Sequence, residues 1–346
     1  MGARWRRLPP TAKAFIGLAV CLLLLAGGAV GSLVYAQHRL DHQLDRVDVF
    51  SGMTGRPHKP TSGPGAEALN ILVMGSDDRP DGEAAPTADT AAWIPGSQRS
   101  DTMMLLHVDA DRAGASVISL PRDAWVDVPG HGSAKINAAF SWGGPRLAVQ
   151  TVEQLTGVHL DHVAWIGWEG FRRLTDTLGG VRVWVPRTVY DSARDVTWTK
   201  GPHDLDGAAA LTYVRQRHGL PGGDLDRIQR QQNFLRSLMD ETRHSFKPTH
   251  PRMMYQILDA LTRNLTVDEG FDAHELRDLV WDLTGMRSDD VDFLSAPVRG
   301  LGWEGDQSVV YLDRAAGEGL WKSVREDRVA GWAEAHPEVQ TPAVVN

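Results

Sequence analysis

The sequence contains almost no cysteine and no excess of positive charge. Cys21 is the single cysteine among 346 residues, so no disulfide can form within the chain. The formal net charge is -8 and the isoelectric point is near 5.9, whereas nucleic-acid-binding domains usually carry a basic face and a high isoelectric point. We therefore expect no nucleic-acid partner, and any local basic cluster should bind a small anion.

Several signatures of known catalytic sites are also absent. The sequence contains no GxSxG, no HExxH and no GxxxxGK[ST], which removes support for a nucleophile-elbow hydrolase, a zinc metalloprotease and a P-loop enzyme. The thirteen histidines are scattered and show no metal-ligand spacing. Residues 300–305 read GLGWEG and formally match GxGxxG. No helix is predicted to follow them, so we predict a hairpin there and not a dinucleotide site.

A long apolar segment is present near the N-terminus. Ala14 to Tyr35 contain no charged residue, and this length crosses a bilayer at about 1.5 Å per residue. We predict a transmembrane anchor at 14–36. Residues 1–13 are basic, so the positive-inside rule predicts a cytoplasmic N-terminus and an extracytoplasmic main domain in the cell membrane. A cleaved signal peptide is the alternative, although the apolar run is longer than a usual signal core.

The rest of the chain divides by composition and periodicity. Leu40, Leu44 and Val47 recur at helical spacing, and residues 55–65 are rich in proline and glycine, which predicts a short stalk followed by a linker. The predicted segments are an extracellular stalk and linker at 37–66, a catalytic domain at 67–245, an extension packed on the same core at 246–332, and a flexible tail at 333–346.

Short apolar runs alternate with amphipathic segments after residue 67. Three runs are typical of buried strands: LNILVMGSD, TMMLLHVD and ASVISLPRD. RLAVQTVEQLTG places apolar residues on one helical face and ends at Gly157. Buried strands that alternate with helices predict an α/β fold with three layers. In the extension, we predict helices at 252–263 and 273–285, then strands at 291–296 and 308–312.

Two aspartates stand where apolar strands meet loops. Asp77 ends the first strand and Asp101 begins the next, so an antiparallel pairing would bring them together at a sheet edge where ligands favour binding. Two carboxylates suit Mg²⁺ that is bound partly by water and phosphate oxygens. The alternative is that both residues form turns or caps.

Basic side chains follow the third strand. Arg122 ends that strand and Lys135 stands before the next helix. A guanidinium fork matches phosphate geometry in a bidentate way, and an ammonium group supplies a compact charge. Each residue taken singly is more often a solvated surface charge.

Four arginines surround a glycine-rich turn between Tyr213 and Phe234: Arg215, Arg217, Arg227 and Arg230. If residues 213–217 are extended, the first two arginines share a face; if they are helical, these arginines diverge. Residues 224–241 predict a helix with Arg227 and Gln231 one turn apart near its N-terminus, where backbone N–H groups favour an anion. The alternative is a set of surface ion pairs with Asp224 and Asp226, which contribute about 0–1 kcal/mol.

The order of these motifs resembles the LytR-CpsA-Psr family of membrane-anchored cell-wall glycopolymer ligases. The matching segments lie between Ala68 and Glu241: NILVMGSDDR, RSDTMMLLHVD, SLPRD, KINAAFSWGG, DTLGGVRV and LDGAAALTYVRQR…DLDRIQRQQ. No single motif is specific, but the set is. The resemblance implies a three-layer αβα fold with a mixed central sheet, preceded by one transmembrane helix, and an apolar tunnel for a lipid.

The resemblance also implies a reaction. A glycopolymer carried on polyprenyl pyrophosphate is attacked by a hydroxyl of peptidoglycan, a phosphodiester forms and polyprenyl phosphate leaves. Asp77 and Asp101 would hold Mg²⁺ or Mn²⁺, and Asp101 or a metal-bound water would accept the proton. The residues implied to surround the pyrophosphate are Arg79, Arg99, Arg122, Lys135, Arg215, Arg217, Arg227 and Gln231. The catalytic residues implied are Asp101, Arg122, Arg217 and Arg227.

The sequence departs from the family's pattern at one loop, and three other functions remain as alternatives. The loop at 81–98 is long and rich in alanine and proline; if it packs differently, Asp78 and Asp89 become rival metal ligands. A pyrophosphatase would use the same site with water as the attacking group. A non-catalytic scaffold would need the arginines but not Asp101. A transcriptional regulator is opposed by the anchor and by the acidic isoelectric point.

Overall fold

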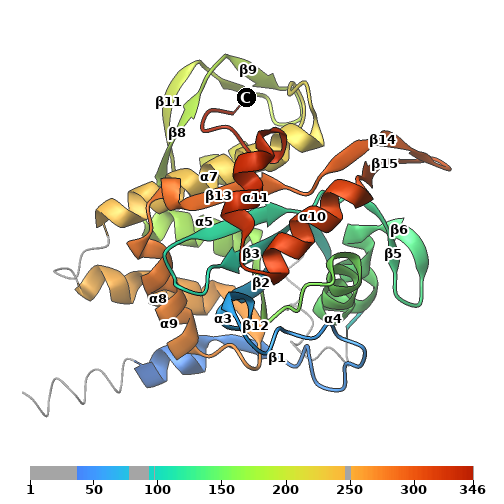
Figure 1. Cartoon of the computed structure of the whole chain (residues 1–346). Coiled ribbons are helices and arrows are strands. Elements are labelled where there is room, and N and C mark those ends of the chain that lie inside the picture. The colour runs from blue at the N-terminus through green and yellow to red at the C-terminus, as the bar shows by residue number, and fades with distance from the viewer. Residues whose placement is uncertain (1–36, 78–92, 97, 246–250, 346) are drawn as a thin grey trace, which may run out of the picture.

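A mixed seven-stranded sheet forms the centre of the protein (Figure 1). The structure is a computed structural model, which describes residues 37–77, 93–96, 98–245 and 251–345. The strands, in their order across the sheet, are β1 (Asp45–Val47), β12 (Leu265–Asp268), β7 (His162–Gly167), β2 (Leu69–Asp77), β3 (Arg99–Val108), β4 (Ala115–Ser119) and β13 (Val291–Ser295). The pairs β1–β12, β7–β2 and β4–β13 are parallel, and the other three are antiparallel.

The apolar strands bury both faces of this sheet, because side chains alternate along a strand. Leu72 and Met74 belong to one core cluster, and their neighbour Ile71 belongs to the other. The register keeps each face consistent across strands: Leu72 lies opposite Leu105, and Ile71 lies opposite Leu106. The sheet therefore needs helices on both sides, as the apolar runs predict.

Helices cover the two faces. One core cluster joins the sheet to α4 (Ile136–Thr156), α10 (Arg314–Arg325) and α11 (Val329–Ala335). Helices α7 (Asp224–Ser245), α8 (Pro251–Asn264) and α9 (Ala273–Gly285) contribute to the other. Beside them, α5 (Trp168–Thr177) contacts α8 and α6 (Gly207–Arg215). This arrangement gives the three layers expected.

Four two-stranded hairpins lie outside the central sheet. Their strands are β5 (Trp125–Val128) with β6 (Gly132–Lys135), β8 (Val181–Val185) with β11 (Gly201–Leu205), β9 (Val189–Asp191) with β10 (Val196–Trp198), and β14 (Val298–Glu304) with β15 (Gln307–Leu312). The last pair confirms the hairpin predicted at 300–305. Its turn requires a positive φ of 62° at Gly305, which glycine adopts without strain.

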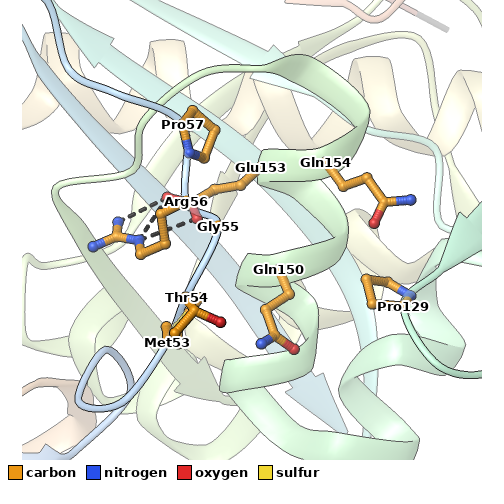
Figure 2. Close-up of a pocket in the computed structure, with 9 residues that line it drawn as sticks. All are labelled: Met53, Thr54, Gly55, Arg56, Pro57, Pro129, Gln150, Glu153 and Gln154. Carbon is orange, nitrogen blue, oxygen red and sulfur yellow. Dashed lines mark hydrogen bonds and ion pairs between the residues drawn. The ribbon is translucent and has the colours of Figure 1, made fainter.

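The segment predicted as stalk and linker is instead part of the folded body. Residues 37–43 are helical, β1 then adds an edge strand to the sheet, and the short helix α3 (Pro64–Glu67) begins at the end of the segment. The following loop is fixed to α4, where Arg56 Nη2 lies 2.7 Å from Glu153 Oε1 (Figure 2). Lys59 Nζ lies 2.6 Å from Asp161 Oδ1. Helical spacing misled here because a three-residue strand shows no periodicity of its own.

The segment predicted as a flexible tail also packs on the core. Ala333 is fully buried and Val345 is 2% exposed. The backbone N–H of Thr341 donates to Phe293 O at 2.7 Å, next to the edge strand β13. The composition of this segment predicted flexibility, whereas a few contacts with the core, distant in the sequence, fix it in place.

No helix within the described residues is both long and apolar enough to cross a bilayer. The predicted anchor, 14–36, lies outside the described residues.

Candidate active site

The ends of β2 and β3 place the two predicted metal-binding aspartates on neighbouring strands. Asp77 lies opposite Arg99 in the antiparallel register, and the register shifts between Gly75 and Ser76. Asp101 is the extra residue of β3 at this bulge, a feature that redirects a side chain. The antiparallel pairing expected from the sequence is present. The side chain of Asp77, and all of Asp78, Arg79 and Asp89, lie outside the described part.

Arg122 connects Asp101 to two further carboxylates. It stands in the turn after β4, and its Nη1 donates to Asp101 Oδ1. Its Nε lies 3.6 Å from Asp224 Oδ1 and 3.8 Å from Asp123 Oδ2. Burial opposes the charge of this guanidinium, but the three carboxylates outweigh burial and raise the pKa of Arg122 above its usual value. Arg122 is therefore a fixed cation at the centre of the site.

Arg227 enters the same cluster from the first turn of α7. Its Nη2 donates to Asp101 O at 3.1 Å and lies 3.0 Å from Asp224 Oδ1. The residue is 3% exposed, and burial lowers the pKa of Arg227 to about 10 against the opposing effect of Asp224. Arg217, half-exposed in the loop before α7, places Nη1 3.7 Å from Asp224 Oδ1. Three arginines thus converge on one aspartate.

Some polar atoms of this cluster have no hydrogen-bond partner among the described residues. They are the buried Nε of Arg122, the buried Nε of Arg227 and Oδ1 of Asp224, which makes ion pairs only. A buried donor without a partner costs about 1–3 kcal/mol. An anion with several oxygens would satisfy both guanidinium groups at once. This geometry favours a phosphate-type ligand over a purely structural ion pair.

Of the other residues predicted to surround the pyrophosphate, one joins the arginine cluster, one is exposed, and one makes a contact between helices. Lys135 joins the cluster through Asp123, with Nζ 3.0 Å from Asp123 Oδ1. Arg99 is exposed at the start of β3. Gln231 is buried, and its Nε2 donates to Val214 O at 3.3 Å, so its amide joins α7 to α6.

The extended alternative for residues 213–217 is wrong for Tyr213 to Arg215, which form the end of helix α6. The helix stops there and Gln216 is extended, so Arg217 lies in the following loop and not on the helix. The guanidinium of Arg215 lies over the ring of Trp168, 4.8 Å from its centroid. Arg230 is fully buried and structural: Nη1 donates to Gln216 Oε1 at 2.6 Å, and the guanidinium lies over the Tyr213 ring.

Sequence reasoning assigned no active-site role to Asp123 and Asp224. Asp224 was considered only as an ordinary ion-pair partner, yet it contacts three arginines. Its signal was its place in the first turn of a helix that also carries Arg227. Asp123 directly follows Arg122 in the sequence, and only the fold shows that it also reaches Lys135.

Comparison with known proteins decides the family. The model of the LytR_cpsA_psr family matches residues 42–325. The chain belongs to this family. Cell wall biosynthesis protein LcpA of Corynebacterium glutamicum is 32% identical over 279 residues, which cover 71% of this chain and 53% of that protein. The chain thus spans about half the length of that relative.

Other members of the LytR_cpsA_psr family match more of their own length. Probable cell wall biosynthesis protein LcpB of Corynebacterium glutamicum is 34% identical over 88% of this chain and 71% of that protein. Polyisoprenyl-teichoic acid–peptidoglycan teichoic acid transferase TagT of Bacillus subtilis is 31% identical over 76% of this chain and 79% of that protein.

Solved structures show the same fold. The crystal structure of Bacillus subtilis TagV has a TM-score of 0.62 and 26% identity, and covers 76% of this chain and 97% of that one. A structure of TagT bound to LIIa-WTA has a TM-score of 0.62 and 24% identity, and covers 82% of this chain and 99% of that one. The mixed sheet with helices on both faces is thus the fold of this family.

Proposed function

We propose that the protein is a membrane-anchored phosphotransferase of cell-wall assembly. It transfers a glycopolymer from a polyprenyl-pyrophosphate carrier to a hydroxyl of peptidoglycan and forms a phosphodiester. The observation that carries this proposal is the buried cluster of Arg122 and Arg227, whose Nη groups meet at Asp101 and whose Nε groups lack hydrogen-bond partners among the described residues. The names of TagT and its relatives, which are transferases from a polyisoprenyl carrier to peptidoglycan, support the same reaction.

The arginines bind and neutralise the pyrophosphate. Phosphoryl transfer depends mainly on positioning and on stabilisation of the charge that develops on oxygen. Arg122 and Arg227 are held rigidly by carboxylates and by a backbone carbonyl, so little reorganisation is needed when the anion binds. Arg217 is more exposed and adds a third guanidinium beside Asp224. Lys135, which pairs with Asp123, supplies additional positive charge.

The transfer itself exchanges one phosphorus–oxygen bond for another. The acceptor hydroxyl oxygen attacks the phosphorus that carries the sugar, and the bond to polyprenyl phosphate breaks. The leaving group takes the bonding electrons, and the acceptor loses its proton. Asp101 is the proposed general base, because its carboxylate is oriented by Arg122 at the centre of the arginine cluster.

A divalent cation, Mg²⁺ or Mn²⁺, is part of the proposal. Carboxylate oxygens are the donors such cations prefer, and the β-bulge places Asp101 close along the ladder to Asp77. The residues fit a hard cation in donor type, with Asp77 and Asp101 as its protein ligands. When bound, the cation would neutralise charge on the pyrophosphate.

Attachment to the membrane through residues 14–36 also belongs to the proposal. The donor's lipid is confined to the membrane, so an anchored enzyme and its substrate share a thin layer next to the bilayer. The main domain would then lie on the extracytoplasmic side, where peptidoglycan is found.

The test combines donor binding with turnover, in the full-length chain purified in detergent. We expect Arg227→Ala to weaken binding of a polyprenyl-pyrophosphate-linked sugar, because one lost charge-assisted contact costs about 1.5–3 kcal/mol, or roughly ten- to a hundredfold in affinity. Asp101→Asn should retain binding but lose release of polyprenyl phosphate. Arg182→Ala is the matched control, since this exposed arginine pairs with Asp204 on the β8–β11 hairpin.

The outcomes separate the alternatives. Release that requires added peptidoglycan supports the transferase. Equal release without an acceptor identifies a pyrophosphatase. Binding without release in the wild-type protein identifies a scaffold. Unchanged binding in Arg227→Ala would contradict the proposed site.

A further inference from the structure

A large cavity lies beside the candidate active site and is not explained by it. Its volume is about 870 Å³, within the range of ligand pockets. It is formed by α4, α10, β5 and the β14–β15 hairpin, which extends outward from the body next to α10 (Figure 1). The cavity thus lies at one side of the molecule, bordered by an element that projects into solvent.

The lining of this cavity combines aromatic rings with polar groups of both charges. Trp125, Tyr311 and Trp321 contribute the rings. The polar lining includes Gln154, which donates to Asp127 at 2.7 Å. Three carboxylates face two guanidinium groups there: Asp127, Asp313 and Glu318 with Arg299 and Arg314. The charges nearly balance, so the cavity favours neither a polyanion nor a polycation.

Two residues of β14, Gly302 and Glu304, fix the position of the Tyr311 ring. A Cβ on Gly302 would lie 2.4 Å from Tyr311 Cε2, so only glycine allows the ring to lie this close to β14. The phenol donates to Glu304 Oε1 at 2.7 Å, which fixes the orientation of the ring.

The cavity and the arginine cluster share one short stretch of backbone. Trp125 follows Arg122 by three residues, directly after the turn that Arg122 and Asp123 form. Between them, Asp123 O accepts from the N–H of Val310, the neighbour of Tyr311. Trp125 also lies opposite Lys135 in the β5–β6 ladder. A ligand in the cavity therefore has one end close to the site where a hydroxyl would attack phosphorus.

We propose that this cavity binds the acceptor, a glycan strand of peptidoglycan; the inference rests on the proposed transferase function. Flat aromatic rings fit the apolar C–H faces of sugar rings, and the carboxylate, amide and guanidinium groups can bond to hydroxyls and acetamido groups. The donor sugar is joined directly to the pyrophosphate, which the arginines hold outside this cavity. The acceptor is therefore the better fit.

The test is the binding of a soluble peptidoglycan tetrasaccharide to the full-length chain in detergent, by titration calorimetry. We expect saturable binding that weakens about tenfold or more in Trp125→Ala, because a loss of about 1.4 kcal/mol corresponds to a factor of ten. The double variant Arg299→Ala/Arg314→Ala changes only exposed side chains and should weaken binding without a change in melting temperature. Trp184→Ala is the matched control, since Trp184 is exposed on β8.

Donor binding, measured in parallel, distinguishes the two proposals. If the cavity variants lose the tetrasaccharide but retain the polyprenyl-pyrophosphate donor, the inference is supported. If the wild-type chain binds donor but not tetrasaccharide, or if the cavity variants bind the tetrasaccharide like wild type, the inference is overturned while the proposed function stands. A failure of donor binding in the wild-type chain would instead remove the proposed function, and with it the acceptor role of this cavity.

Discussion

Arginines in this protein serve two different purposes, and burial alone does not distinguish them. Arg230 is fully buried with a neutral amide and an aromatic ring as partners, so it supports the junction of α6 and α7. Arg227 is equally buried, yet it pairs with the carboxylate of Asp224, which Arg122 and Arg217 also approach. Several cations gathered around one carboxylate are typical of an anion-binding site and not of a single structural contact.

Replacing Arg227 by methionine should therefore separate stability from function. Burial lowers the pKa of Arg227 to about 10, which means that the folded protein disfavours the charged form. Removing one partner of a buried ion pair is destabilising when the other charge is left uncompensated, but Asp224 would keep Arg122 and Arg217 as partners. We expect Arg227→Met to melt at the same or a higher temperature than wild type, and to lose donor binding. Calorimetric melting and a donor-binding assay measure the two effects.

Arg217→Met provides the comparison for this prediction. Arg217 is about half-exposed and 3.7 Å from Asp224, and exposed pairs contribute about 0–1 kcal/mol. Its replacement should weaken donor binding with little change in melting temperature. A large loss of stability in Arg227→Met would show that its pairing with Asp224 is structural, contrary to the binding role.

At the scale of single residues, the sequence indicates which residues belong to the arginine cluster more readily than it indicates which residues contact one another. Arg122, Arg227 and Asp101 meet as the motifs suggest. Arg215 does not, because one turn of helix rotates it onto Trp168. Asp224 becomes the hub only when α7 meets the turn after β4. Contacts between residues distant in sequence depend on register and helix rotation, which periodicity does not reveal.

At the scale of the elements, the buried side chain of Gln232 fixes helix α7 against its neighbours. This buried glutamine donates to Ser119 Oγ at 2.7 Å and to Leu294 O at 2.5 Å, and it accepts from Thr341 Oγ1. It therefore joins α7 to β4, β13 and the C-terminal segment. Because Arg227 lies five residues earlier on the same helix, the position of the helix also sets the position of the guanidinium.

Gln232→Ala should destabilise the protein and loosen the active site together. Several buried polar groups would lose their partner, at about 1–3 kcal/mol for each group left unsatisfied. We expect a drop of several degrees in melting temperature and a weaker affinity for the donor. Gln229→Ala on the same helix is the control and should melt like wild type. Equal melting of the two variants would show that Gln232 does not position α7.

Helices and long strands of this fold are predictable from sequence, and short strands are not. The range 273–285 is a helix as predicted, because its apolar stripe and its Asp272 cap are local features. Strands β1 and β12 have three and four residues, too few to show alternation. They exist because each completes the hydrogen bonds of a neighbour in the sheet, and that neighbour is distant in the sequence.

For the whole molecule, the terminal segments close the fold. The loop after β1 is fixed to α4 by Arg56 and to the segment before β7 by Lys59, and the C-terminal residues run along β13. A stop codon after Val339 should therefore lower the melting temperature, because it removes the Thr341 contacts and buried Val345. Thermal melting of the truncated chain measures this effect. If the truncated chain melts at the same temperature as the full chain, residues 340–346 do not contribute to stability, as expected for a flexible tail.

The C-terminal segment is also joined to the sheet by a buried polar contact that responds to pH. His107, fully buried on β3, places Nε2 3.0 Å from Asp327 Oδ1. Asp327 also accepts from the N–H of Ala110 at 3.2 Å. The hydrogen bond from His107 lowers the pKa of Asp327, with burial as the opposing effect. An aspartate with a lowered pKa stabilises the folded state above its unfolded pKa, and this contribution is lost as the pH falls through the folded value.

Asp327→Asn isolates this contribution, since asparagine also tolerates the positive φ of 57° at this position. At pH 7 we expect the variant to be less stable by about 1 kcal/mol, a typical value for one hydrogen bond, with part of the loss offset because Asp327 also raises the pKa of nearby Asp109. As the pH falls below the unfolded pKa of an aspartate and then through the lower folded pKa of Asp327, the carboxylate becomes protonated in both states, and the difference should shrink. Paired melting curves at pH 7 and at lower pH measure it. A difference that stays constant with pH would show that the charge of Asp327 contributes nothing to holding the C-terminal segment on the sheet.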